Sequence, residues 1–180
     1  MATSTSIRSW RRRARKEMVT SRAATLKFVR TLPRADVLRP RTQDAWSVKD
    51  VLVHLLSCDE ETLRRFRLIS QGRADRIVWF DVAHANRFNA RSVARGRRVG
   101  LPVVLRRLAR VRAEMVRLFD RLPDGSLRDP GHDYTVVSWL PAPGWSHERD
   151  HIGGVQRWWR AERAAGAGSR PRRRPRPRRR

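Results

Sequence analysis

Residues 47–69 read S-V-K-D-V-L-V-H-L-L-S-C-D-E-E-T-L-R-R-F-R-L-I. Apolar side chains recur in this stretch at intervals of three and four residues, which is the spacing of one face of an α-helix. Ser47 and Asp50 form a capping-box pattern, so we expect the helix to begin there and to end near Gly72. The apolar arc comprises Val48, Val51, Leu52, Leu55, Leu56, Leu63, Phe66 and Ile69. His54 lies at the edge of this arc, where a side chain can reach a groove between helices.

Three further long helices are predicted. Residues 8–32 form the first, which Pro33 ends, and residues 145–162 form the last. Between them, Pro102 occupies the first turn of a helix that ends before Pro123. Its apolar residues alternate at intervals of four and three, as in the seam of an antiparallel bundle: Val104, Leu108, Val111, Met115, Leu118 and Leu122.

A shorter helix is expected over residues 81–95, after a run at 77–80 that could be extended. These elements predict an all-α fold, a four-helix bundle with a long crossover between the second and third long helices. Gly153 and Gly154 lie inside the last helix, where each costs about 1 kcal/mol relative to alanine. A close helix contact would be one reason for them.

The composition gives one domain with unusually basic ends. No apolar run is long enough to span a membrane, and the single cysteine, Cys58, suits a reducing cytoplasm. The net charge is +25, and more than half of it comes from six basic residues in 8–16 and eight arginines in 170–180. We therefore divide the chain into a basic N-terminal extension (1–16), a helical bundle (17–163) and a disordered Arg/Pro-rich tail (164–180). Such a tail would bind nucleic acid or acidic lipid without sequence preference.

Three histidines form the candidate site. His147 and His151 are four residues apart, so they share one face of the last helix, and His54 lies on another helix. Three imidazoles can hold a divalent metal and leave one coordination position open. The alternative is that surface histidines fall at this spacing by chance. Cys58, one turn after His54, is either a thiolate ligand or a small core residue, and the second interpretation is favoured.

Two acidic residues flank the ligands on the last helix. Glu148 and Asp150 could each accept a hydrogen bond from an imidazole and so orient it. The interpretation that we favour for both is a charged side chain on the solvated face of the helix. His84 and His132 lie outside these motifs and are interpreted as surface residues.

The motifs resemble those of the DinB/YfiT-like superfamily. W-S-V-K-D-V-L-V-H-L at 46–55 and H-E-R-D-H-I-x-x-V-x-x-W at 147–158 carry the resemblance, together with D-V-x-x-x-N-R-F-N-A at 81–90 and L-P-D-G-S-L at 122–127. The resemblance implies an up-down-down-up four-helix bundle, often dimeric, with a divalent metal, zinc in the first place or nickel, on His54, His147 and His151. Members of this superfamily include transferases that use mycothiol or bacillithiol, mycothiol-dependent maleylpyruvate isomerases and small resistance proteins.

The expected function is therefore a metal-dependent, thiol-dependent transferase or isomerase, or a hydrolase, acting on small electrophiles in detoxification or stress. The expected partners are a low-molecular-weight thiol, a small-molecule electrophile and a second copy of the chain. Two alternatives remain: a metal-binding stress-response bundle without catalysis, and a basic nucleic-acid-binding protein that acts through its tail. The sequence assigns no catalytic or cofactor-binding residue beyond the metal ligands.

Overall fold

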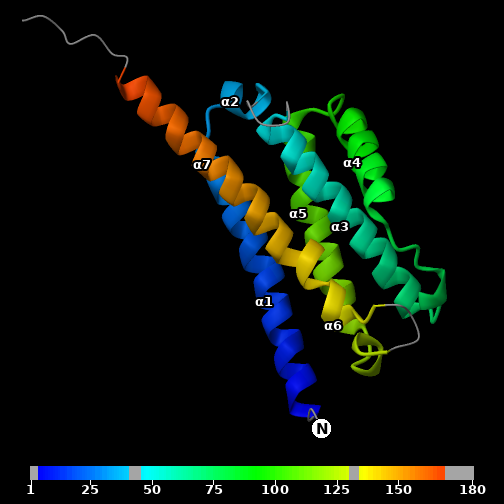
Figure 1. Cartoon of the computed structure of the whole chain (residues 1–180). Coiled ribbons are helices and arrows are strands. Elements are labelled where there is room, and N and C mark those ends of the chain that lie inside the picture. Colours follow the sequence, from blue (N-terminus) through cyan, green and yellow to red (C-terminus); the bar gives the residue numbers. More distant parts are fainter. Residues whose placement is uncertain (1–3, 41–45, 130–133, 169–180) are drawn as a thin grey trace, which may run out of the picture.

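The computed structural model describes residues 4–40, 46–129 and 134–168, and these ranges fold as helices without a β-strand (Figure 1). The long helices are α1 (Ser4–Val29), α3 (Val48–Ser70), α5 (Leu101–Arg121) and α7 (His147–Gly168). They run up, down, down and up in Figure 1, so the predicted bundle topology is confirmed. No helix within the described ranges is long and apolar enough to cross a membrane.

Shorter elements connect the long helices. α2 (Arg34–Leu38) joins α1 to α3, while η1 (Ala74–Arg76) and α4 (Val82–Gly96) form the crossover from α3 to α5. The connection from α5 to α7 contains η2 (Gly125–Leu127), α6 (Val136–Trp139) and the π turn η3 (Ala142–Ser146). α4 packs along the outer side of α3, as Figure 1 shows. The run at 77–80 adopts no regular secondary structure, so it is not a strand.

The predicted capping box begins α3. The Ser47 hydroxyl accepts a hydrogen bond from the Asp50 amide at 3.0 Å, and the Asp50 carboxylate accepts one from the Ser47 amide at 3.0 Å. α4 begins with a single N-cap bond, in which the Asp81 carboxylate accepts from the His84 amide. These side chains satisfy amides that have no partner within their helix, which fixes both helix starts.

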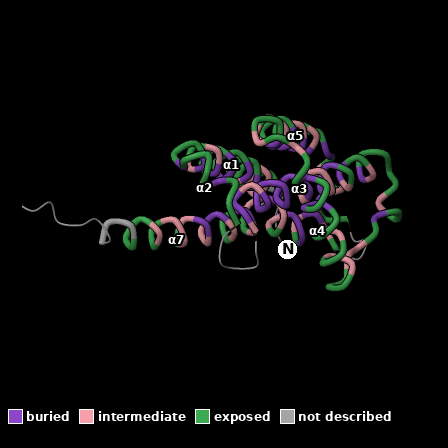
Figure 2. The backbone as a smooth tube through the Cα atoms, turned by 90° about the horizontal axis from the view of Figure 1, so that it is seen from above, coloured by how far each residue is buried: buried purple, intermediate pink, exposed green. Residues whose placement is uncertain are grey.

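The core lies between the facing sides of the long helices, and Figure 2 shows buried backbone along their inner sides. The apolar arc of α3 is buried, as is the seam of α5 apart from the half-buried Leu118. Phe66 of α3 stacks on Phe119 of α5 with ring centroids 5.7 Å apart. The two helices that carried the clearest sequence patterns therefore form the centre of the bundle.

The basic N-terminal stretch is part of the bundle rather than an extension from it. α1 is continuous from Ser4, and both Ile7 and Ala14 are buried. Arg11 donates hydrogen bonds to the carbonyl oxygens of Phe119 and Leu122 at the end of α5, at 2.6 and 2.5 Å. A cation is favourable at a helix C-terminus because the carbonyl groups there carry partial negative charge. This arginine thus joins α1 to the end of α5.

At the other end of the chain, α7 continues through Gly168. The helix therefore includes residues 164–168, which the sequence assigned to a disordered tail. Residues 169–180, with most of the Arg/Pro-rich sequence, lie outside the described residues, as does His132.

The glycine pair inside α7 has no close helix contact, so the reason suggested by the sequence is wrong. A Cβ atom added to Gly153 would come no nearer than 3.5 Å to another atom, the flexible tip of Arg157, and at Gly154 the distance is 3.8 Å. We expect Gly153→Ala to raise the free energy of unfolding by about 1 kcal/mol, because alanine loses less backbone entropy.

Urea denaturation followed by circular dichroism measures this change. Gly96→Ala in α4 is the contrasting variant, because its Cβ would lie 2.2 Å from a methyl group of Val53. It should lower the free energy of unfolding by about 1–3 kcal/mol. Destabilisation by Gly153→Ala would show that α7 needs the glycine for a reason other than space.

Candidate metal centre

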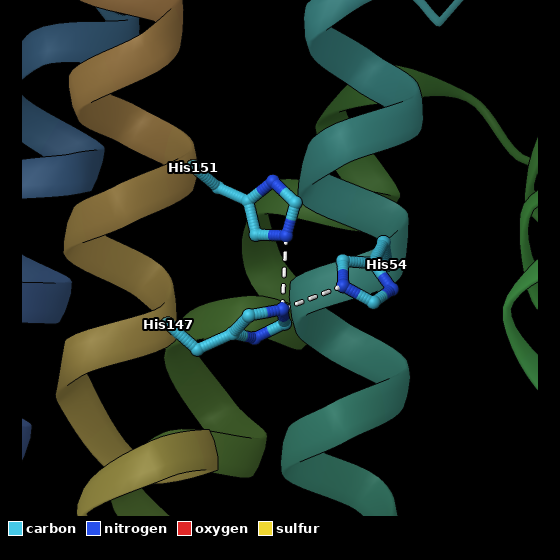
Figure 3. Close-up of side chains that lie close together, drawn as sticks. All are labelled: His54, His147 and His151. Atoms are coloured by element: carbon cyan, nitrogen blue, oxygen red, sulfur yellow. Dashed lines mark hydrogen bonds between the residues drawn. The ribbon is translucent and has the colours of Figure 1, made fainter. Parts of the chain in front are cut away.

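The structure brings the three predicted histidines together (Figure 3). His54 extends from α3, and His147 and His151 extend from α7 towards it. The Nε2 atom of His147 lies 3.1 Å from His54 Nε2 and 2.9 Å from His151 Nε2. Their ligand atoms all lie within 4.8 Å of one another, so this group could hold a metal ion.

The direction of the α7 histidines depends on how that helix begins. Its first turn follows the π turn η3, in which the His147 amide bonds to the Ala142 carbonyl five residues earlier. A π turn contains one more residue than an α turn, so it rotates the side chains that follow. From His147 onward α7 is an α-helix, and the spacing of four keeps His151 on the same face.

Hydrogen bonding alone does not account for these contacts. Each imidazole nitrogen carries either one proton or one lone pair in the ring plane, so it makes one good hydrogen bond. His147 Nε2 has two ring nitrogens within 3.1 Å, and it cannot satisfy both. Around a tetrahedral zinc ion with bonds of 2.0–2.1 Å, ligand nitrogens are about 3.3 Å apart. The two distances to His147 Nε2 approach that value, and all three ligand atoms lie within 4.8 Å of one another, so the three residues could hold a metal ion.

Burial favours the neutral form of His54 and His147. The pKa of His54 is lowered to about 3, first by burial and then by the neighbouring His147 and His151. Burial also lowers the pKa of His147. Metal binding requires the unprotonated nitrogen, so these two imidazoles do not need to lose a proton at neutral pH before they bind an ion.

The crossover helix adds a residue that orients His54. The Asn89 side chain of α4 lies beside the His54 imidazole and opposes the lowering of its pKa, and the centroids of the Trp46 and His54 rings are 5.5 Å apart. A hydrogen bond to a ligand imidazole fixes the ring and its tautomer. The sequence assigned no role to Asn89, because it could not show which face of the short helix meets α3.

The sequence matches the DinB superfamily over residues 17–155. This protein belongs to the DinB superfamily. The matched range contains all three histidines of the candidate metal centre. Neither the search of curated proteins nor the search of solved structures gave a match.

In this DinB-superfamily protein, a cavity of about 290 Å³ opens beside the metal centre. Its lining combines two of the three histidines with aromatic, apolar and a few polar side chains: His54, Cys58, Glu61, Thr62, Arg65, Phe80, Ala85, Phe88, Asn89, Ala142, Pro143 and His147. The volume suits one small organic molecule, and most of the wall is apolar. A molecule bound there would lie against the imidazoles.

Cys58 lines this cavity but does not form part of the metal-binding group. Its Sγ atom is 3.9 Å from His54 Nε2, and burial, followed by the negative charge of Asp59, raises the thiol pKa to about 12. The thiol is therefore protonated at neutral pH and a poor nucleophile. This agrees with the interpretation of Cys58 as a small residue at the edge of the core.

Glu148 is not a solvated surface charge, so that part of the sequence interpretation is wrong. Glu148 is the next residue after His147 in α7, and its side chain is fully buried in the bundle. The carboxylate lies 3.1 Å from Arg112 of α5 and 3.0 Å from Arg22 of α1, and it accepts a hydrogen bond from Ser21. Asp150 is exposed, as expected.

A fourth buried charge completes this network. Asp59 of α3 pairs with Arg112 at 2.7 Å and with Arg22 at 3.0 Å. The buried quartet of Arg22, Asp59, Arg112 and Glu148 thus has no net formal charge and contacts all the long helices. It holds α3 and α7 together next to the histidines that these helices carry. A charged residue within an apolar face was the available signal, because Asp59 follows Leu55 and Leu56 at helical spacing.

Proposed function

We propose that this protein binds a divalent metal ion, zinc in the first place, and catalyses the attack of a low-molecular-weight thiol on a small electrophile. The observation that carries the proposal is the convergence of three imidazole nitrogens at the wall of a cavity large enough for a small molecule. A bound zinc ion would supply Lewis acidity, which lowers the pKa of a thiol or of water. His54, His147 and His151 are the residues that would hold it.

The cavity supports a small, partly apolar substrate. Phe80, Phe88 and Pro143 give its wall an apolar surface against which the apolar part of a substrate can pack. Arg65 is held in place by Glu61 at 2.9 Å and by the Trp79 ring, with its guanidinium carbon 4.6 Å from the ring centroid. A rigid wall of this kind can position an electrophile against the imidazoles.

The nucleophile in this proposal comes from outside the chain. Cys58 is the only cysteine, it does not belong to the three residues whose ligand atoms converge, and burial raises the pKa of its thiol. An external thiol would lose its proton and form the new bond to the electrophile, whose leaving group departs with the bonding electrons. With water in place of the thiol, the same arrangement would give hydrolysis.

The test compares zinc-loaded wild type with His151→Ala and Cys58→Ser. Bound metal is measured by mass spectrometry, and conjugation of 1-chloro-2,4-dinitrobenzene is followed by absorbance with mycothiol, bacillithiol and simpler thiols. We expect His151→Ala to lose both metal and rate, while Cys58→Ser keeps both. An equal rate in His151→Ala would overturn the catalytic proposal. Bound metal without any thiol- or water-dependent rate would mean that the protein is a metal-binding bundle without this catalytic activity.

A further inference from the structure

α4 carries a row of basic side chains beside the cavity. His84, Arg87, Arg91 and Arg95 are spaced at three and four residues, so they lie along one side of the helix. Together with Phe88 they line a recess of about 340 Å³. The three arginines are exposed, whereas His84 is half-buried and therefore not the simple surface residue that the sequence suggested.

Within the described ranges of the chain, no ion pair neutralises the arginines of this row, whereas some arginines on neighbouring helices are paired. Arg67 and Arg107 are paired with Glu114 and Glu60 on adjacent helices. In contrast, no carboxylate among the described residues forms an ion pair with Arg87, Arg91 or Arg95, and the sequence has no acidic residue between Asp81 and Glu114. The guanidinium groups of this row therefore keep their hydrogen-bond donors available for a ligand.

The recess and the cavity at the metal centre share an aromatic wall. Phe88 lines both of them, and the Phe80 ring contacts Phe88 with centroids 5.2 Å apart. His84 stacks on the other part of this wall, 4.1 Å from the Phe80 centroid. The residue after Phe88, Asn89, reaches the ligand His54. One turn of α4 thus links the basic recess to the metal centre.

We infer that α4 forms an anion-binding subsite, in which Arg87 and Arg91, with His84, hold a carboxylate or phosphate of the reacting thiol or electrophile. This inference rests on the proposed function for the identity of the ligand, because one end of the molecule would lie at the recess and its reactive end at the histidines. Guanidinium groups bind carboxylate and phosphate with two parallel hydrogen bonds, which fixes orientation as well as charge. The subsite would select anionic reactants over neutral ones.

The test uses the zinc-loaded full chain and the double variant Arg87→Gln/Arg91→Gln. The matched control is Arg106→Gln/Arg110→Gln on α5, which removes the same charge from exposed positions away from the recess. Binding of 3-mercaptopropionate and of inorganic phosphate is measured by calorimetry, with 2-mercaptoethanol as the neutral thiol. We expect the double variant to bind the anionic probes about tenfold more weakly, with the control and the neutral thiol unchanged.

Kinetics then show whether the thiol or the electrophile has the anionic group that binds the subsite. The neutral 1-chloro-2,4-dinitrobenzene is compared with 4-chloro-3,5-dinitrobenzoate, each with the neutral and the anionic thiol. A selective loss of kcat/KM for one anionic reactant in the double variant would assign the subsite to that reactant. Equal weakening in the variant and the control would overturn the subsite, because it would reflect net charge alone. Loss of anion binding in a protein without any conjugation activity would support the subsite and overturn the proposed function.

Discussion

Arg112→Ala is expected to lower the free energy of unfolding by about 3–5 kcal/mol, because it leaves two buried carboxylates with a single cation. Arg112 contacts Asp59 at 2.7 Å and Glu148 at 3.1 Å, and it also donates to the carbonyl oxygens of Met18 and Gly144. Its side chain is almost completely buried, so water cannot replace these interactions. Urea denaturation followed by circular dichroism measures the change.

A surface arginine of the same helix provides the control. Arg107 pairs with Glu60, but both side chains are about two-fifths exposed, so Arg107→Ala should cost less than about 1 kcal/mol. Because a domain is stable by only about 5–15 kcal/mol, Arg112→Ala could be largely unfolded, and Arg112→Lys is the milder second variant. Equal losses for Arg107→Ala and either Arg112 variant would show that the buried quartet does not hold the bundle together.

The double variant Arg112→Met/Asp59→Leu tests the charge balance directly. It removes one cation and one anion and leaves Arg22 paired with Glu148 at 3.0 Å. We expect its loss of stability to be smaller than the sum for Arg112→Met and Asp59→Leu, since neither remaining charge is unpaired. A purely additive result would mean that the two side chains act independently.

The local parts of this fold could be predicted from the sequence. The Ser47 and Asp50 cap, the apolar arc of α3 and the seam of α5 depend on residues a few positions apart, and the structure confirms them. The quartet could not be predicted in this way, because its members come from four helices and the burial of each depends on the other three. Glu148 looked like a surface charge since nothing within its own helix indicates the arginines of α1 and α5.

The candidate metal centre also combines features that could be predicted from the sequence with features that could not. The spacing of His147 and His151, with His54 on another helix, left a chance arrangement open, and the resemblance to the DinB/YfiT-like superfamily selected the three residues that the structure brings together. Asn89 and the π turn η3 were not predictable, because one depends on how the crossover packs and the other on one extra residue in a helical turn. The first helix was predicted over residues 8–32, but the contact of Arg11 with the end of α5 was not, because it joins residues more than 100 positions apart.

His54→Ala is expected to weaken zinc binding by at least about 100-fold, because loss of a residue that merely orients a ligand already costs 10–100-fold. His54 is the single contribution of α3 to the site, so the variant leaves two imidazoles of one helix and separates metal binding from bundle packing. Competition with a chromophoric chelator at pH 7 measures the affinity. His84→Ala is the control, since its ring stacks on Phe80 and lies outside the metal-binding group.

The zinc affinity of Asn89→Ala is compared with that of His54→Ala. If Asn89 acts by fixing the His54 ring, its removal should weaken zinc binding by about 10–100-fold, which is less than loss of the ligand and more than the His84 control. Unchanged affinity in His54→Ala would mean that the ion, if bound, is held by α7 alone, and the convergence of the two helices would then have no role in metal binding. A graded loss from Asn89→Ala to His54→Ala would instead show that the crossover helix, α3 and α7 build one site together.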